Sequence, residues 1–315
     1  EAPLVTVQAF QRNVAWVSGT DEAIAILKLC LTEGYSFDDL AVRALRDGDR
    51  VDPWEPVLEI RGPYPAFAHL ETLYLGVLAR RTMIATNTRR VVEAAWPDPI
   101  LFFPARHDHW MVQTGDGFAA HTAGAIGVST DAQASWWGSE GVGTVPHGLI
   151  AAFGRDTVAA TEAFARHMPD HVRVISLVDF DNDCVGTSLA VARALGDRLF
   201  GVRLDTSGNL VDRSVQSQMG EFDPRGVNTR LVENVRKALD AEGFDHVRIV
   251  ASGGFDADKI RRFKNAGVPV NAYGVGSALI RGRYDFTADV VRLGGRDVAK
   301  TGRRYRESTR LEEVR

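Results

Sequence analysis

The chain has 315 residues, a formal net charge of −4, 45% hydrophobic and 25% charged residues. These values are typical of a folded globular protein, long enough for one large α/β barrel or two domains. Lys and Arg are scattered rather than gathered into a stripe, and no run approaches the roughly 18 apolar residues of a membrane span, so we expect neither nucleic acid nor a membrane as a partner.

Only two cysteines are present, Cys30 and Cys184. They are too few for a disulfide framework and do not form a C-x-x-C pair. We expect both to be buried, unreactive thiols in a reducing environment, and we predict a cytoplasmic location.

The first 98 residues carry mixed strand and helix signals. Residues 50–60, with prolines at their entry, predict an edge strand. Apolar residues at helical spacing predict one or two helices over residues 66–95. Two prolines, at 97 and 99, break this pattern, so we place a domain boundary there and predict a mixed α/β, sandwich-like domain over 1–98.

Beyond this boundary, short apolar runs alternate with helical stretches, which is the pattern of βαβ units. Seven runs end at Arg106, Ser129, His147, Asp179, Asp205, Gly254 and Ser277. Parallel barrels and open parallel sheets both place active sites at such strand ends. We predict an irregular TIM-like α/β barrel of about seven strands over 99–277, with a doubly wound sheet as the alternative.

After the barrel, residues 278–315 are predicted to return to the first domain. The apolar run within 284–293 predicts a strand that joins it, and the basic, polar tail from 303 predicts a solvated end.

Two strand ends carry glycine turns. The first is Ser252-Gly253-Gly254, and the second is Gly274-Val275-Gly276-Ser277. Glycine lets backbone N–H groups approach an oxyanion closely, and barrels commonly bind phosphate at their last two strands. A plain strand-to-helix turn explains one such segment, but the repeat on the next strand favours a phosphate site formed by both.

Carboxylates alternate at another strand end, at Asp179, Asp181 and Asp183. In extended chain they fall on one side, which suggests a Mg²⁺ site; the alternative is a solvated acidic turn. Arg203 and Asp205 share a face of the next strand and offer a guanidinium for phosphate or carboxylate and an acceptor for a hydroxyl. A structural ion pair is the alternative for these two.

His147 follows Pro146 at a predicted helix start, where the helix dipole should lower its pKa. A neutral imidazole there is a competent nucleophile, and Thr144 is placed to bind an added phosphoryl group; a histidine that only caps the helix is the alternative. His107 and His109 near Arg106 allow a zinc site, but no third ligand is indicated, so no structural zinc is predicted.

Five ordered blocks carry a family resemblance: GVGTVPHGLI, VDFDND, GVRLDTS, VASGGFD and YGVGSAL. Together with LETLYLGVLARRTMIAT and FPARH, they make the chain resemble nicotinate phosphoribosyltransferases, particularly the shorter microbial form of these type II phosphoribosyltransferases. The resemblance implies transfer of a phosphoribosyl group from phosphoribosyl pyrophosphate to nicotinate, giving nicotinate mononucleotide and pyrophosphate in NAD synthesis, coupled to ATP hydrolysis.

The resemblance also implies roles for single residues. His147 becomes a transiently phosphorylated histidine, Arg203 and Arg106 bind substrate and pyrophosphate, and Asp179 and Asp205 handle ribose hydroxyls or Mg²⁺. The two glycine turns take the 5-phosphate. Family members are homodimers with active sites shared between subunits, and the same is expected here.

Ser129 stands where nicotinamide-using relatives carry an aspartate, which would repel a substrate carboxylate, so nicotinate is preferred over nicotinamide. Quinolinate-using relatives share the barrel but not the histidine block. Departures from the family pattern at Pro104 and Asn209, and the absence of its opening aspartate-x-tyrosine segment, leave a non-catalytic nucleotide-binding relative as a further alternative.

Overall fold

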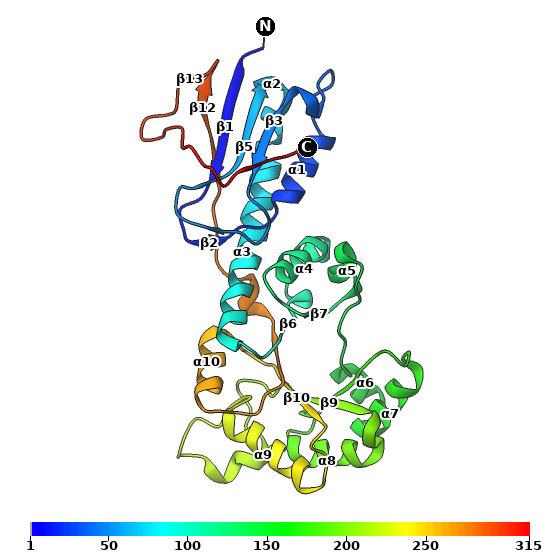
Figure 1. The fold of residues 1–315 in the computed structure, drawn as a ribbon. Coiled ribbons are helices and arrows are strands. Elements are labelled where there is room, and N and C mark those ends of the chain that lie inside the picture. Colours follow the sequence, from blue (N-terminus) through cyan, green and yellow to red (C-terminus); the bar gives the residue numbers. More distant parts are fainter. Residues whose placement is uncertain (1) are drawn as a thin grey trace. The chain divides into compact units, whose positions relative to one another are not determined.

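The structure, a computed structural model, describes residues 2–315, which divide into two compact units (Figure 1). The first unit contains the residues up to Arg89 together with Val112–Gly124 and Ile280–Arg315. The second contains Arg90–Met111 and Ala125–Leu279. The predicted boundaries at 98 and 278 therefore differ from these units in two segments: 90–98, assigned to the first domain, lies in the second unit, and 112–124, assigned to the barrel, lies in the first. The second boundary lies within two residues of the observed one.

The first unit contains a six-stranded antiparallel sheet in the order β13-β12-β1-β5-β3-β14. Its strands are β1 (Leu4–Phe10), β3 (Ala41–Ala44), β5 (Pro56–Pro63), β12 (Thr287–Leu293), β13 (Arg296–Asp297) and β14 (Glu312–Glu313). A separate pair joins β2 (Ala15–Trp16) and β4 (Arg50–Val51). The helices are α1 (Thr20–Leu29), α2 (Tyr64–Phe67), α3 (Glu71–Ala95) and α4 (Gln113–Thr122), and the division between the units falls within α3.

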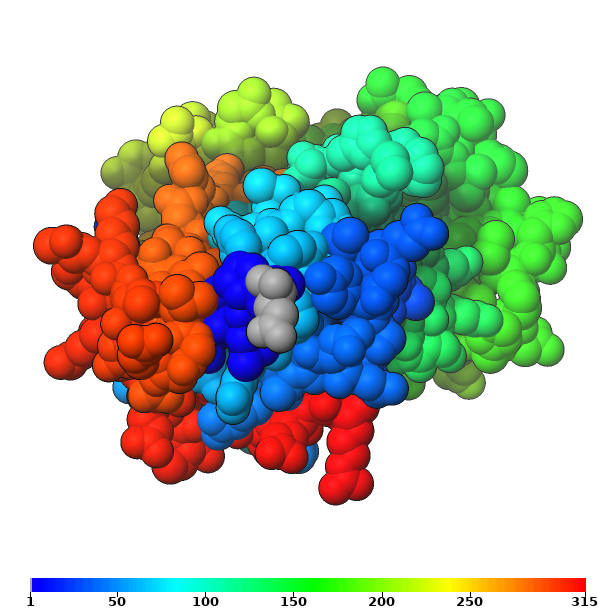
Figure 2. Space-filling model, turned by 90° about the horizontal axis from the view of Figure 1, so that it is seen from above, coloured from blue at the N-terminus to red at the C-terminus, as the bar shows by residue number. Residues whose placement is uncertain are grey.

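The C-terminal segment returns to the first sheet, as predicted. β12 pairs along β1, with Val290 opposite Val7, and both views show the orange-red end of the chain beside the blue N-terminal strands (Figures 1 and 2). The prediction of a solvated tail is wrong: β14 pairs with β3, Arg303 lies 4.9 Å over the Trp54 ring, and Leu311 is buried. Hydrogen bonds also tie the segment to the sheet, from Arg43 to Leu311 O at 3.0 Å and from Arg310 to Glu55 at 2.7 Å, while most of its other side chains remain exposed or half-buried.

The predicted edge strand at 50–60 is also corrected. It splits into β4 and β5, and β5 lies between β1 and β3, inside the sheet. Pro53 falls in the turn and Pro56 is the first residue of β5. Proline at a strand start removes no hydrogen bond from the middle of the ladder, so these prolines are compatible with a central strand.

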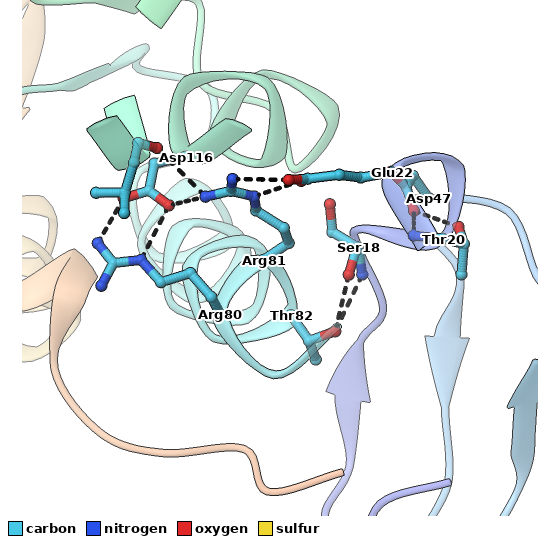
Figure 3. A network of polar contacts seen from close by, with 9 residues as sticks. Ser18, Thr20, Glu22, Asp47, Arg80, Arg81, Thr82 and Asp116 are labelled. Carbon is cyan, nitrogen blue, oxygen red and sulfur yellow. Dashed lines mark hydrogen bonds and ion pairs between the residues drawn. The ribbon is translucent and has the colours of Figure 1, made fainter. Parts of the chain in front are cut away.

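A buried charge network explains why segment 112–124 belongs to the first unit (Figure 3). Arg81 on α3 donates to Glu22 through Nε at 2.8 Å and to Asp116 on α4 through Nη1 at 2.6 Å. Arg80 donates to the other Asp116 oxygen at 2.6 Å. A Cβ on Gly115 would lie 2.2 Å from Arg81 Cζ, so only glycine allows this approach.

The second unit contains a parallel sheet in the order β7-β6-β11-β10-β9-β8. Its strands are β6 (Ile100–Phe102), β7 (Gly127–Val128), β8 (Val174–Leu177), β9 (Leu199–Leu204), β10 (Arg248–Ala251) and β11 (Ala272–Val275). Its helices are α5 (Asp131–Ala134), α6 (His147–Ala152), α7 (Thr157–His167), α8 (Cys184–Leu195), α9 (Thr229–Ala241) and α10 (Ala257–Asn265).

Short 3-10 turns occur in both units, at η1 (Phe37–Asp39), η2 (Ala68–Leu70), η3 (Ala105–His107), η4 (Trp110–Val112), η5 (Ser135–Trp137), η6 (Gly196–Arg198), η7 (Arg213–Gln218) and η8 (Ser277–Ile280).

Six of the seven predicted runs form strands, which gives a mixed α/β fold with a parallel half-barrel sheet. The run that ends at His147 does not, and its prediction as a strand is wrong. It makes only two backbone bonds to the sheet edges, from Val142 N to Val128 O at 2.6 Å and from Val145 N to Ile175 O at 3.0 Å. Glycines within the run and Pro146 at its end disfavour a regular ladder, so an irregular segment connects β7 and β8.

Of the two thiols, Cys184 is buried, but Cys30 is exposed, against prediction, because it follows the last residue of α1. No helix in the described part of the chain has both the length and the apolar character needed to cross a bilayer.

Candidate active site

A cavity of about 550 Å³ lies at the carboxyl ends of the parallel strands, within the second unit. Most of the residues singled out from the sequence line it: Arg106, Ser129, Thr144, His147, Arg203, Asp205, Ser252, Gly253, Gly254, Gly274, Gly276 and Ser277. Because parallel strands end at the same edge, residues separated by more than 150 positions meet here. Val275 is buried at the end of β11 and does not line the cavity.

Arg203 is the centre of the polar contacts in this cavity. Its guanidinium donates through Nε to Ser252 Oγ at 2.9 Å, through Nη1 to Thr144 Oγ1 at 2.9 Å, and through Nη2 to Asp205 Oδ2 at 2.8 Å. The Ser252 hydroxyl has two acceptors for its one hydrogen, Asp205 Oδ1 at 2.8 Å and Leu204 O at 3.0 Å. The ion pair expected as the alternative is present, but it belongs to a closed ring of hydrogen bonds that faces the cavity.

The first glycine turn has the geometry of an anion-binding loop. Gly253 and Gly254 have φ values of 84° and 69°, two consecutive left-handed residues. Successive backbone N–H groups in such turns can converge on one anion. Ser252 anchors the start of the turn, because its N–H donates to Leu204 O at 2.9 Å.

The second glycine turn differs, because its glycines serve close packing. Neither Gly274 nor Gly276 has a positive φ. A Cβ on Gly274 would lie 2.7 Å from the Phe103 ring, and a Cβ on Gly276 would lie 2.9 Å from His107 Cε1. The glycines therefore let these two rings pack against the end of β11.

His147 is the first residue of α6, as predicted, but the predicted direction of its pKa shift is wrong. Its Nε2 lies 3.1 Å from Asp179 Oδ1, and this hydrogen bond with the buried carboxylate raises the pKa of His147. The neighbouring carboxylate outweighs burial of the ring. With Nε2–H donating to Asp179, Nδ1 of the neutral ring keeps a free lone pair.

The three alternating aspartates are not gathered around one point, because each has a different partner. Asp179 pairs with His147, Asp181 with Arg155, and Asp183 accepts from Gly186 N at the start of α8. β8 ends before Asp179 and the chain turns, with Asn182 at φ 57°, so the alternation expected of extended chain is lost. Across residues 2–315, no three His, Cys, Asp or Glu side chains are arranged as ligands of one metal ion.

Two further predicted residues lie at the cavity wall. The Ser129 hydroxyl is 3.2 Å from Phe102 O and 3.1 Å from Gln133 Oε1, so its single hydrogen already has two acceptors. Arg106 is exposed and lines the cavity. No carboxylate of the described chain pairs with its guanidinium, which leaves its N–H groups available to a ligand.

Sequence reasoning missed Phe103 as a residue of the site and considered His107 only as a zinc ligand. Phe103 lines the cavity and its ring lies 5.4 Å below the Arg203 guanidinium, and His107 contacts Gly276. Both residues follow β6, close to Arg106. Their position after a predicted strand is the sequence signal that could have assigned them to the site. Phe103 supplies the cavity with an aromatic surface.

Comparisons with known proteins identify relatives of this chain. The chain is 30% identical over 240 residues to nicotinate phosphoribosyltransferase pncB2 of Mycobacterium tuberculosis, covering 76% of this chain and 48% of that protein. The pncB1 enzyme of the same organism is 32% identical over 250 residues, covering 78% and 51%. The solved structure of nicotinate-nucleotide pyrophosphorylase from Pyrococcus furiosus is 31% identical with a TM-score of 0.83, covering 99% of this chain and 77% of that one. The chain belongs to the nicotinate phosphoribosyltransferase family. Its residues 1–82 also match the family model described as the quinolinate phosphoribosyl transferase N-terminal domain.

Membership of the nicotinate phosphoribosyltransferase family confirms the resemblance stated from the sequence. The chain spans about half the length of the curated relatives it matches.

Proposed function

We propose that this chain is a nicotinate phosphoribosyltransferase that forms nicotinate mononucleotide and pyrophosphate from nicotinate and phosphoribosyl pyrophosphate. The observation that carries the proposal is the hydrogen-bonded ring of Arg203, Ser252 and Asp205 beside the left-handed Gly253–Gly254 turn. This arrangement joins a phosphate cradle to a cation and to a hydroxyl acceptor in one cavity, which is what a ribose 5-phosphate requires.

In the proposed reaction, the bond from ribose C1 to the pyrophosphate oxygen breaks and the pyridine nitrogen donates its lone pair to C1. The glycine turn holds the 5-phosphate, and Asp205 accepts a hydrogen bond from a ribose hydroxyl. The exposed Arg106 guanidinium stabilises the departing pyrophosphate, whose negative charge grows as the bond breaks. The pyridine nitrogen carries no proton, so no general base is needed for its attack.

ATP coupling is assigned to His147. Its Nδ1 attacks the γ-phosphorus of ATP, ADP leaves with the electron pair of the broken bond, and water later hydrolyses the phosphohistidine. Asp179, 3.1 Å from Nε2, holds the ring in the tautomer that this attack needs. Thr144, three residues before His147, lines the same cavity.

Nicotinate is preferred to nicotinamide because no acid side chain stands at Ser129. Its hydroxyl has two protein acceptors and would give up one of them to donate to the substrate carboxylate. A quinolinate-type activity is the second candidate, because the matched family model is described by that substrate. Quinolinate carries an additional carboxylate, and its conversion to nicotinate mononucleotide releases CO₂.

One assay separates the candidates. The protein is incubated with phosphoribosyl pyrophosphate, Mg²⁺ and ATP, and with nicotinate, nicotinamide or quinolinate in parallel reactions, while pyrophosphate, ADP and CO₂ are measured. We expect pyrophosphate and ADP to form only in the reaction that contains nicotinate. CO₂ release with quinolinate would favour the second candidate, and nucleotide binding without any product would favour a non-catalytic relative.

The remaining expectations extend this proposal. Mg²⁺ would enter bound to the pyrophosphate of the substrate, since the three aspartates expected to hold it are separated. We also propose that the six-stranded half-barrel and the irregular segment after β7 together surround the cavity as an irregular barrel. We further propose that two chains associate with shared active sites, and that the two free thiols indicate the cytoplasm.

A further inference from the structure

Lys259 lies behind the first glycine turn, in the first turn of α10. Its Nζ donates to the carbonyl oxygen of Gly253 at 3.1 Å. The ammonium also lies 4.3 Å from the centre of the Phe255 ring and 6.0 Å from that of Phe263. It is therefore held from three sides, by one peptide group and two aromatic faces.

The charge of Lys259 has no carboxylate partner in the part of the chain that the structure describes. Asp256, the nearest acid on its helix, uses its side chain to accept from the backbone N of Lys259 at 2.8 Å. The pKa of the ammonium is lowered to about 8, chiefly by burial and in part by the charge of Arg262, while the charge of Asp256 opposes the shift. A half-buried cation without a counter-ion is unfavourable, unless a ligand supplies the negative charge.

The direction of the Gly253 carbonyl determines where the next N–H points. In a planar trans peptide, the C=O of one residue and the N–H of the next point in opposite directions. Because the Gly253 carbonyl faces Lys259, the N–H of Gly254 faces away from it. Gly253 and Gly254 line the cavity and Lys259 does not, so this N–H is directed to the cavity side.

We propose that Lys259 is a positioning residue for the phosphate monoester of the substrate, which it orients by fixing the Gly253–Gly254 peptide and favours with its positive charge. This inference rests on the proposed function, because it assigns the 5-phosphate of phosphoribosyl pyrophosphate to this turn. If Lys259 only held the turn against α10 through its hydrogen bond to Gly253, it would contribute to the stability of the fold but not to phosphate affinity.

The test uses ribose 5-phosphate as the probe, measured by calorimetry at pH 7, and the KM values of both substrates. Lys259→Met keeps the apolar stem and removes the charge. We expect it to weaken ribose 5-phosphate binding about tenfold or more and to raise the KM for phosphoribosyl pyrophosphate by a similar factor. The KM for nicotinate and kcat should stay within about threefold. Lys259→Arg should restore most of the affinity, since it keeps the charge and a donor.

Arg261→Met is the matched control. Arg261 lies on the same helix and pairs only with the exposed Asp258 at 2.6 Å, so its loss should leave phosphate affinity unchanged. Unaltered ribose 5-phosphate binding by a folded Lys259→Met, or no binding by the wild type, overturns the inference. If wild type binds ribose 5-phosphate through Lys259 but turns over no pyridine base, the proposed function fails and this inference stands.

A pH series covers the case in which Lys259→Met does not fold. As the pH rises from 7 to 9.5 through about 8, the ammonium loses its proton, so wild-type affinity for ribose 5-phosphate should fall, whereas Lys259→Arg should stay constant. The charges that act on this ammonium are those of Asp256 and Arg262 on α10. Asp205 lies against the other side of Gly253, and Tyr273 on β11, whose pKa is raised by burial, packs against the Phe255 and Phe263 rings. Equal pH profiles for the wild type and Lys259→Arg overturn the inference.

Discussion

Arg203 donates hydrogen bonds to three side chains at the cavity. Three of its five N–H groups are used by Ser252, Thr144 and Asp205, and two are left for a ligand. The planar guanidinium orients all three partners at once, which a lysine ammonium cannot do. Arg203 therefore links Asp205, the proposed acceptor of a ribose hydroxyl, to Ser252 at the start of the first glycine turn.

Replacing Arg203 by Lys should retain the fold and lose activity. The charge stays, but the fixed fork and at least two hydrogen bonds to a charged group are lost, each worth roughly 1.5–3 kcal/mol. We expect kcat/KM for phosphoribosyl pyrophosphate to fall by about 100-fold or more, measured by steady-state kinetics. A fall of less than fivefold in a variant with wild-type circular dichroism would show that the ring does not act on substrate.

At His147, activity should depend on pH through the contact with Asp179. That carboxylate raises the pKa of His147, so the neutral, nucleophilic ring becomes populated only as the pH rises through the raised value. Asp179→Asn removes the charge, lowers the pKa of His147, and should shift ATP-dependent phosphorylation to lower pH with a reduced maximal rate. The measurement is the acid-labile phosphoprotein formed with ATP between about pH 5.5 and 8.5, with His147→Ala as the blank.

The stability contribution of this pair changes with pH in the opposite direction to activity. A raised pKa in the folded state means that the His147–Asp179 pair stabilises the fold fully below the unfolded value of about 6.5 and loses this contribution as the pH rises through the folded value. If the phosphorylation profile of Asp179→Asn coincides with that of the wild type, or moves to higher pH, then Asp179 does not raise the pKa of His147 as described.

Among the elements, β11 depends on the absence of side chains at its end. A Cβ on Gly274 would lie 2.7 Å from the Phe103 ring and 3.2 Å from Ser252 Cβ. Both neighbours line the cavity, so the packing of β11 against β6 and β10 also sets the shape of the site.

Gly274→Ala should therefore affect both stability and activity. We expect about 1–3 kcal/mol of lost stability from overpacking, together with a higher KM for phosphoribosyl pyrophosphate as Ser252 moves. Gly208→Ala is the control, because a Cβ there meets nothing within 4 Å and its φ is not positive. Equal urea midpoints for the two variants would show that the close approach of Phe103 is not needed.

The sequence predicted the parallel strands and their polar ends well, because apolar runs and the residues that end them are local signals. It did not predict the irregular segment before His147, where Gly143 and Pro146 override an apolar run. It also failed for Asp181 and Asp183, since a turn with one left-handed residue, Asn182, sends neighbouring carboxylates to different partners.

At the scale of the whole molecule, the grouping of the chain into units depends on contacts that no local pattern records. Segment 112–124 belongs to the first unit, where Asp116 accepts from both Arg80 and Arg81. An acid and two arginines separated by more than 30 positions give no sequence signal of their pairing. Here only the three-dimensional arrangement identifies the partner.

Arg81→Met should destabilise the first unit. The side chain is 8% exposed, and its loss leaves Glu22 without its partner, while Asp116 keeps Arg80. Removing one member of a buried ion pair costs about 3 kcal/mol, which we expect as a lower free energy of unfolding in urea. The exposed Arg166→Met is the control; an equal, small loss in both variants would mean that the network does not stabilise the unit.

The central claim is that one cavity holds a pyridine nucleotide with its phosphate in the glycine turns. A crystal structure of the protein with nicotinate mononucleotide tests it most directly. The account predicts the phosphate against Gly253–Gly254 and Gly276–Ser277, a ribose hydroxyl on Asp205, and the base near Phe103 and Ser129. A nucleotide bound outside this cavity, or with its phosphate away from both turns, would contradict it.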